Sequence, residues 1–124
     1  MPLSVLVIDD QPLEGEMISY ILHRDRPEVT YAGQALNAAD GIRMAGESKP
    51  DLIFLDIKMP GMDGLEATRR IRAFDPSVPI VAVTAFAYDR DRQKALDAGA
   101  SEYLSNPLNG ERLRQTLREL LSEE

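Results

Sequence analysis

The stretch that decides the fold of this chain is DLIFLDIKMPGMDG, residues 51–64. Its apolar run from Leu52 to Leu55 is typical of a short strand that is buried on both faces. Pro60 lacks an amide donor and Gly61 favours turns, so the strand ends before them. Asp56 therefore lies where a buried strand emerges at the edge of a sheet. It is either an ordinary turn residue or a nucleophile or metal ligand.

The composition limits the classes of protein to which the chain can belong. With 124 residues, we expect one domain, 1–124, whose core needs no disulfide or structural metal. The absence of cysteine excludes disulfides and thiolate chemistry. No apolar run is long enough to span a membrane, and the first residues do not resemble a signal peptide, so we expect a cytoplasmic protein without a membrane partner. The formal charge of −7 argues against direct nucleic-acid binding and favours cations.

Five apolar or half-apolar runs alternate with five helical patterns. We expect strands within residues 3–8, 28–33, 52–55, 78–83 and 101–104, and helices that begin near Pro12, Leu36, Asp63, Asp89 and Leu113. This alternation predicts an α/β fold, a doubly wound parallel sheet with five helices on two faces. The first, third and fourth runs are apolar throughout and favour central positions, whereas the second and fifth are half-polar and favour edges. Strand order 2-1-3-4-5 meets both conditions with right-handed crossovers.

Local patterns predict where helices begin and end and which side chains are buried. Asp63 with Glu66 forms a capping-box pattern, and Gly99 is expected to end a helix. Helical spacing predicts two buried faces, one formed by Leu13, Met17, Tyr20 and Ile21 and the other by Leu36, Ala39 and Ile42. Exposed side chains are expected at His23, Arg69, Arg70 and Arg72.

Acidic and polar residues follow the predicted strands. Because parallel strands have their carboxyl ends at one rim of the sheet, Asp9, Asp10 and Asp56 are expected to converge near the point where the strand order reverses. Thr84 and Asn106 follow the fourth and fifth strands. Three converging carboxylates repel one another unless they are protonated or neutralised, and an all-oxygen ligand set suits Mg²⁺.

Taken together, these motifs closely resemble the receiver domain of two-component response regulators, over nearly the whole chain. The matching pieces are Val7-Ile8-Asp9-Asp10, residues 56–64, Val83-Thr84-Ala85, and Gly99-Ala100 followed by Tyr103-Leu104. The resemblance implies a flavodoxin-like sheet and a signalling domain that is not a classical enzyme but assists its own phosphotransfer and dephosphorylation. A stand-alone receiver and one segment of a larger regulator or hybrid kinase are both compatible with it.

The resemblance also implies a role for each matching residue. Asp56 would accept a phosphoryl group from a phosphohistidine on a sensor histidine kinase or phosphotransfer protein. Asp9 and Asp10 would hold Mg²⁺ together with Asp56 and the backbone carbonyl of Lys58. Thr84 would bond the phosphoryl oxygens, and Tyr103 would change rotamer. The fourth helix, fifth strand and fifth helix would carry the signal to a downstream protein or effector domain. The resemblance is also compatible with a homodimer.

One residue departs from the family pattern. The family has a lysine before the proline that follows the fifth strand, where this chain has Asn106. The alternative function is therefore a receiver-like interaction module with impaired or absent phosphorylation switching. If the domain is phosphorylated, Lys58 is a candidate to supply part of the missing charge, against the alternative of a solvated loop lysine. The resemblance also predicts a cis Asn106–Pro107 peptide.

Two other classes of protein fit the sequence less well. Haloacid-dehalogenase-like phosphatases also place an aspartate nucleophile after a strand, but they need a second aspartate where Lys58 stands here. Nucleotide-binding folds need a glycine-rich phosphate loop, and neither GxxxxGK[ST] nor GxGxxG follows any predicted strand.

Overall fold

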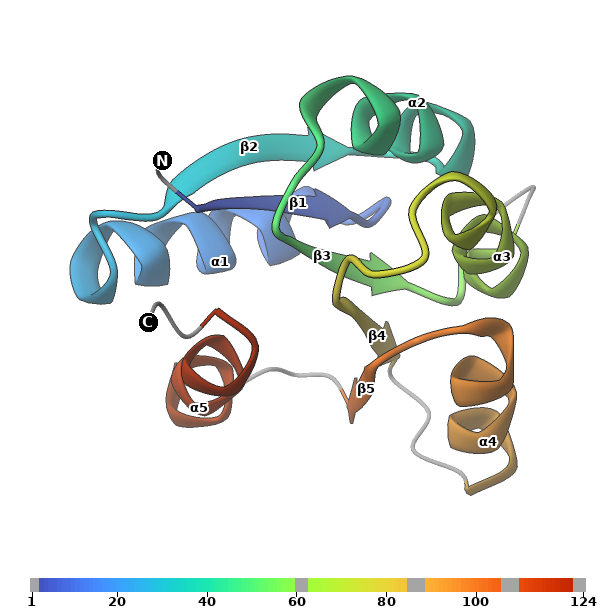
Figure 1. Cartoon of the computed structure of the whole chain (residues 1–124). Coiled ribbons are helices and arrows are strands. Elements are labelled where there is room, and N and C mark those ends of the chain that lie inside the picture. Colours follow the sequence, from blue (N-terminus) through green and yellow to red (C-terminus); the bar gives the residue numbers. More distant parts are fainter. Residues whose placement is uncertain (1–2, 60–62, 85–88, 106–109, 122–124) are drawn as a thin grey trace.

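The computed structural model, which describes residues 3–59, 63–84, 89–105 and 110–121, contains a parallel sheet of order β2-β1-β3-β4-β5 (Figure 1). The central strands are β1 (Ser4–Ile8), β3 (Leu52–Asp56) and β4 (Ile80–Thr84), and the edge strands are β2 (Thr30–Ala35) and β5 (Glu102–Ser105). The apolar runs are therefore central and the half-polar runs are at the edges. This confirms the predicted α/β fold, its strand order and its flavodoxin-like topology.

Helices cover both faces of the sheet (Figure 1). One face carries α1 (Pro12–Asp25) and α5 (Gly110–Leu120), and the other carries α2 (Ala38–Ser48), α3 (Gly64–Phe74) and α4 (Asp89–Ala98). Within β1, Val5 and Val7 pack towards α1 and α5, whereas Leu6 and Ile8 pack towards α2, α3 and α4. Burial on both faces explains why the central strands are continuous apolar runs rather than alternating ones.

Two helix boundaries follow the predicted caps. The side chain of Asp63 accepts a hydrogen bond from the backbone N–H of Glu66 at 2.8 Å and so caps the start of α3. Gly99 follows α4 with a φ of +118°, a conformation that side-chain-bearing residues rarely adopt. Among the helices of the described segments, none is long and apolar enough to cross a membrane.

The predicted buried face of α1 was partly wrong. Leu13 and Tyr20 are 74% and 62% exposed, so they lie on the outside of the helix. The face against the sheet is instead formed by Gly15, Ile18, Ile21 and Leu22. Apolar residues occur on both sides of this helix, and spacing alone cannot say which side faces the sheet.

Two further expectations were also wrong. Leu36 is 51% exposed and precedes α2, because the side chain of Asn37 caps that helix by accepting from the N–H of Asp40 at 2.8 Å. Ala39 is also exposed, so of the predicted face only Ile42 is partly buried. Arg72 is half-buried rather than solvated. Its guanidinium donates to the carbonyl oxygens of Gly99 and Asp75 at 2.8 and 3.1 Å and to Ser101 Oγ at 3.3 Å. The predicted cis Asn106–Pro107 bond lies outside the described residues.

Candidate functional site

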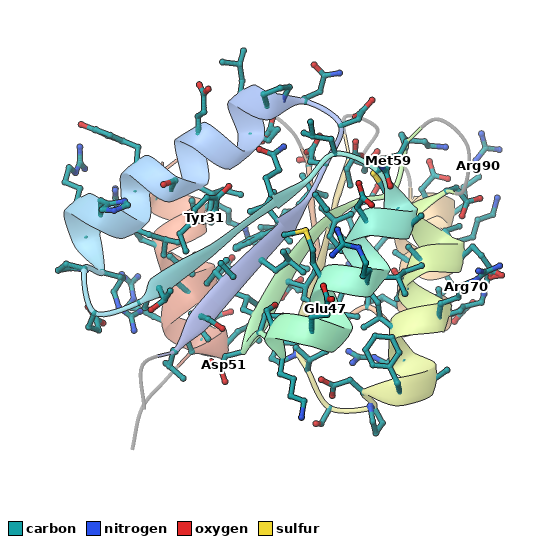
Figure 2. All side chains as sticks on the ribbon, turned by 90° about the horizontal axis from the view of Figure 1, so that it is seen from above. Tyr31, Glu47, Asp51, Met59, Arg70 and Arg90 are labelled. Atoms are coloured by element: carbon teal, nitrogen blue, oxygen red, sulfur yellow. The ribbon has the colours of Figure 1, made fainter. Side chains whose placement is uncertain are left out.

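The predicted acidic residues and Thr84 lie at the carboxyl end of the sheet. Asp9 and Asp10 follow β1, Asp56 is the last residue of β3, and Thr84 is the last residue of β4. Figure 2 shows the two ends of β3, with Asp51 at one end of the sheet and Met59 at the other. Because the strands are parallel, β1, β3 and β4 all deliver their last side chains to this end.

Three carboxylates meet there. One oxygen from each of Asp9, Asp10 and Asp56 lies within 4.8 Å of the others. Asp9 is 4% exposed and Asp56 is 9% exposed, whereas Asp10 is half-buried. Like charges at this separation, withdrawn from water, repel one another strongly.

A backbone amide two residues later orients each of the two buried carboxylates. The N–H of Gln11 donates to Asp9 Oδ1 at 2.8 Å, and the N–H of Lys58 donates to Asp56 Oδ1 at 3.0 Å. These turns point both carboxylates back over the end of the sheet. Side-chain orientation at the site is therefore set by backbone geometry in the β1–α1 and β3–α3 connections.

Burial dominates the electrostatics of the cluster. It raises the pKa of Asp9 from 3.8 to about 7, the Gln11 amide opposes the shift, and the charges of Asp56, Glu14 and Asp10 add to it. Burial likewise raises the pKa of Asp56, with further increases from Asp10 and Glu14. A positive charge at this position would reverse these penalties, because it favours the ionised carboxylates.

Glu14 is a member of this electrostatic group that the sequence reasoning missed. Its charge acts on both Asp9 and Asp56, and burial raises its own pKa. Its Oε2 atom is buried and has no hydrogen-bond partner among the described residues. The available signal was the position of Glu14 in the first turn of a helix that begins directly after Asp9 and Asp10.

Gly64 allows α3 to begin close to the phosphoacceptor candidate. A Cβ atom at this position would collide with the backbone of Ile57 and would lie 2.5 Å from the carbonyl oxygen of Asp56. The N–H of Gly64 instead donates to the carbonyl oxygen of Ile57 at 3.2 Å. The Asp63-Gly64 pair thus caps a helix and permits close approach of the backbone at the edge of the site.

The remaining predicted residues lie on β4, on β5 and in the β3–α3 connection, or are not described. Thr84 is fully buried and pairs with Ser105 of β5. Tyr103, also on β5, is half-buried and packs on the core face that α2, α3 and α4 cover. Lys58 is exposed and lines a hollow of about 270 Å³ together with residues of the β3–α3 connection and Asp91 and Lys94 of α4. Asn106 lies outside the described residues.

The residues present fit a hard divalent cation. All the converging ligands are carboxylate oxygens, and Mg²⁺ prefers such oxygens while it keeps several waters. Burial and the neighbouring carboxylates raise the pKa of Asp9, so a cation bound here would offset an electrostatic penalty. The set lacks histidine and thiolate ligands among the described residues, which argues against a zinc-type centre.

Comparison with known proteins places this geometry in a family. Residues 5–118 match the model of the response regulator receiver domain. The chain is 35% identical to the probable transcriptional regulatory protein TcrX of Mycobacterium tuberculosis over 97% of this chain and 50% of the relative. It is 32% identical to protein PilH of Pseudomonas aeruginosa over 95% of this chain and 97% of the relative. The chain thus spans about half of TcrX and nearly all of PilH.

A solved structure shows that the similarity extends to the fold. The receiver domain of the Saccharomyces cerevisiae response regulator Ssk1, solved with the histidine phosphotransfer signalling protein Ypd1, matches with a TM-score of 0.86 and 28% identity. The match covers 95% of this chain and 88% of that one. The family model covers most of the chain, and sequence and fold agree. The chain therefore belongs to the receiver-domain family of two-component response regulators.

Proposed function

We propose that this receiver accepts a phosphoryl group on Asp56 in a Mg²⁺-dependent reaction. Receiver domains are signalling modules rather than classical enzymes, so the proposed modification is a signal and not a catalytic turnover. The observation that carries the proposal is the convergence of the Asp9, Asp10 and Asp56 carboxylates at the carboxyl end of the sheet.

The metal would be held by Asp9, Asp10 and Asp56, with the backbone carbonyl of Lys58 as a further ligand. When bound, it supplies positive charge that offsets the carboxylates and the phosphoryl oxygens. The protein contributes orientation, because the Lys58 amide fixes the Asp56 carboxylate. Thr84 is proposed to donate its hydroxyl to a phosphoryl oxygen.

The transfer itself is a displacement at phosphorus. A carboxylate oxygen of Asp56 attacks the phosphorus of a phosphohistidine, and the phosphorus–nitrogen bond breaks. The electron pair of that bond stays on the imidazole nitrogen, and the product is an acyl phosphate. A carboxylate is a competent nucleophile here because positioning and charge neutralisation supply most of the catalysis.

We further propose a sensor histidine kinase or phosphotransfer protein as the donor, and the α4–β5–α5 face as the output surface. The donor proposal is supported by the Ssk1 receiver, which was solved with a phosphotransfer protein. The phosphoryl group brings about two negative charges next to Thr84, enough to bias a loop and helix between two arrangements. Tyr103 on β5 lies on the α4 side of the sheet, where such a change would be transmitted.

One experiment tests the phosphoacceptor assignment. The protein is incubated with Mg²⁺ and a small phosphoramidate donor, and intact-protein mass spectrometry measures the added phosphoryl group. Asp56→Asn should abolish the addition, whereas Asp51→Asn at the opposite end of β3 should not. Phosphorylation of Asp56→Asn equal to wild type would contradict the assignment. No phosphorylation of wild type at saturating donor would favour the non-switching interaction module.

A second experiment tests the metal. Calorimetric or NMR titration should show that Mg²⁺ binds the unphosphorylated protein, and Asp10→Asn should weaken binding at least about tenfold, since it removes a charged ligand. Unchanged affinity in Asp10→Asn would show that the metal binds elsewhere.

The Lys58 hypothesis has its own comparison. If the Lys58 ammonium offsets phosphoryl charge, Lys58→Ala should slow phosphorylation of wild type, and the loss should be smaller in an Asn106→Lys background. Equal rates for wild type and Lys58→Ala would leave Lys58 without a role in the reaction.

A further inference from the structure

A side chain from the neighbouring strand β2 forms hydrogen bonds to the β1–α1 connection, which carries Asp9 and Asp10. The amide nitrogen of Gln34 on β2 donates to the carbonyl oxygen of Asp9 and to that of Gln11, both at 2.9 Å. These two carbonyls flank Asp10 in the chain. A primary amide has two N–H donors, so one side chain can hold both carbonyls at once.

These two hydrogen bonds restrain a connection whose following helix, α1, begins without a side-chain cap. Gln11 is the N-cap residue of α1, yet its side chain makes no capping hydrogen bond. Within the connection, the N–H of Gln11 donates to Asp9 Oδ1 at 2.8 Å. Backbone bonds hold its two sides, from Asp9 N–H to Ala35 O at 3.0 Å and from Glu14 N–H to Gln11 O at 3.1 Å. Gln34 ties these two sides together across the residue that lies between them, Asp10.

An irregularity in β2 aims Gln34 at this connection. Tyr31 pairs with Val5 and Gly33 with Leu6, so Ala32 is an extra residue in the ladder, and Gly33 has a φ of +122°. In a regular strand, residues 31 and 34 would point to opposite faces, because side chains alternate. The extra residue puts Gln34 on the same face as Tyr31, towards α1.

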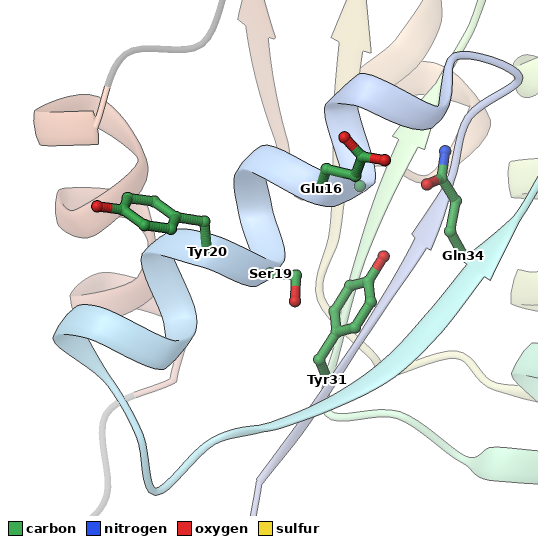
Figure 3. A pocket seen from close by; sticks show the side chains of 6 residues that line it. Glu16, Ser19, Tyr20, Tyr31 and Gln34 are labelled. Atoms are coloured by element: carbon green, nitrogen blue, oxygen red, sulfur yellow. The ribbon is translucent and has the colours of Figure 1, made fainter.

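The helix is shaped to receive the two side chains. Gly15 of α1 is buried, and a Cβ atom there would collide with Gln34 Oε1 and lie 2.7 Å from the Tyr31 hydroxyl. Figure 3 shows Tyr31 and Gln34 rising from β2 towards α1, around a hollow of about 330 Å³ that Glu16, Ser19 and Tyr20 also line. Glycine at this position therefore lets Gln34 lie against the helix and reach the connection.

We propose that Gln34 is a positioning residue for the cation site, and that the β2 bulge and Gly15 allow its amide to reach the carbonyls flanking Asp10. The inference rests on the proposed binding of Mg²⁺ by Asp9, Asp10 and Asp56. Gln34 does not contact the cation in this scheme. It restricts the backbone that presents two of the three carboxylates, and so lowers the cost of bringing them to one ion.

The test compares Mg²⁺ affinities of folded variants by calorimetric titration at constant ionic strength. Gln34→Met keeps the length and volume of the side chain but removes both donors. It should weaken Mg²⁺ binding roughly tenfold, a usual loss when a residue that orients the ligands of a metal is changed. The matched control is Tyr31→Phe, which alters the same hollow without touching the connection and should bind as wild type does. Equal affinities for Gln34→Met and wild type would overturn the inference while leaving the proposed function intact.

A second variant, Gln34→Glu, separates the effect of positioning from the effect of charge. It also keeps the inference testable if Gln34→Met does not fold. Gln34→Glu has nearly the shape of glutamine and adds a negative charge, which by electrostatics alone would strengthen cation binding. Positioning predicts weaker binding instead, because the carboxylate cannot donate to either carbonyl. Stronger or unchanged binding would overturn the inference. Absence of Mg²⁺ binding by wild type would overturn the proposed metal site and this inference with it.

Discussion

The two ends of the sheet treat their carboxylates differently. At the amino end, Asp51 accepts from the N–H of Ser4 at 2.8 Å, and Asp75 Oδ1 accepts from the N–H of Val78 at 3.0 Å, so each carboxylate is paired with backbone donors. At the carboxyl end, Asp9 and Asp56 also accept from backbone amides, but their carboxylates lie close to each other and to Asp10, and burial raises their pKa values. The amino-end carboxylates therefore act as hydrogen-bond acceptors that join neighbouring segments, whereas burial and mutual repulsion disfavour the ionised carboxylates at the carboxyl end, a penalty that a bound cation would offset.

The largest effect should appear in the pH dependence of the metal-free protein. The pKa of Asp9 is raised from 3.8 to about 7, so between these values the folded state keeps a proton that the unfolded state has lost. This contribution therefore lowers stability as pH rises through that window, by roughly 2–4 kcal/mol in all. Asp9→Asn should remove this fall in stability, and saturating Mg²⁺ should suppress it. Chemical denaturation of wild type and Asp9→Asn across the window measures the difference, and parallel pH profiles would contradict the prediction.

At the amino end, removing a charged side chain should lower the free energy of unfolding, whereas Asp9→Asn at the carboxyl end should raise it. Arg72 holds Gly99, Asp75 and Ser101 together, and so ties the end of α3 to the turn before β5. Arg72→Met should lower the free energy of unfolding by about 2–3 kcal/mol, because three acceptors, two of them half-buried, lose a charged donor. Its Mg²⁺ affinity should equal that of wild type. Arg69→Met, at an exposed position on the same helix, is the control and should change stability little.

A smaller loss is expected at Asp51. Its carboxylate joins the start of β1 to the start of β3 through the N–H of Ser4. Asp51→Ala should lower the free energy of unfolding by about 1–2 kcal/mol, since a partly buried donor is left without its acceptor. Denaturant melts at neutral pH measure it. If Asp51→Ala were more stable than wild type, as is expected of Asp9→Asn, the contrast between the two ends would fail.

The smallest effect should come from Glu14. Its Oε2 atom is buried without a described partner beside Asp9 and Asp56, so its charge adds to the repulsion there. Glu14→Gln should raise the free energy of unfolding of the metal-free protein by about 0.5–1 kcal/mol and lower the pKa of Asp9. Glu16→Gln, at an exposed position on the same helix, should do neither. NMR titration of the Asp9 carboxyl carbon follows the pKa directly, and an unchanged value would show that Glu14 is too well screened to matter.

Several features of this protein are determined by short stretches of its sequence. The central strands were predictable because burial on both faces requires unbroken apolar runs such as Leu52 to Leu55. The start of α3 was predictable because Asp63 caps it locally, with a partner only three residues away. The convergence of Asp9, Asp10 and Asp56 followed from parallel strand direction alone, once the sheet order was known.

Other features depend on contacts between segments that are distant in sequence. Leu13 and Tyr20 were placed on the wrong side of α1 because only the sheet decides which side of a helix with two apolar faces is buried. Arg72 donates to Gly99 and Ser101, which lie 27 and 29 residues further along the chain, and no local pattern predicts these hydrogen bonds. Gln34 reaches the carbonyls around Asp10 only because an extra residue in β2 reverses the direction of its side chain. Local sequence thus sets each element and its caps, whereas pairing register and packing in three dimensions decide which side chains meet at the site.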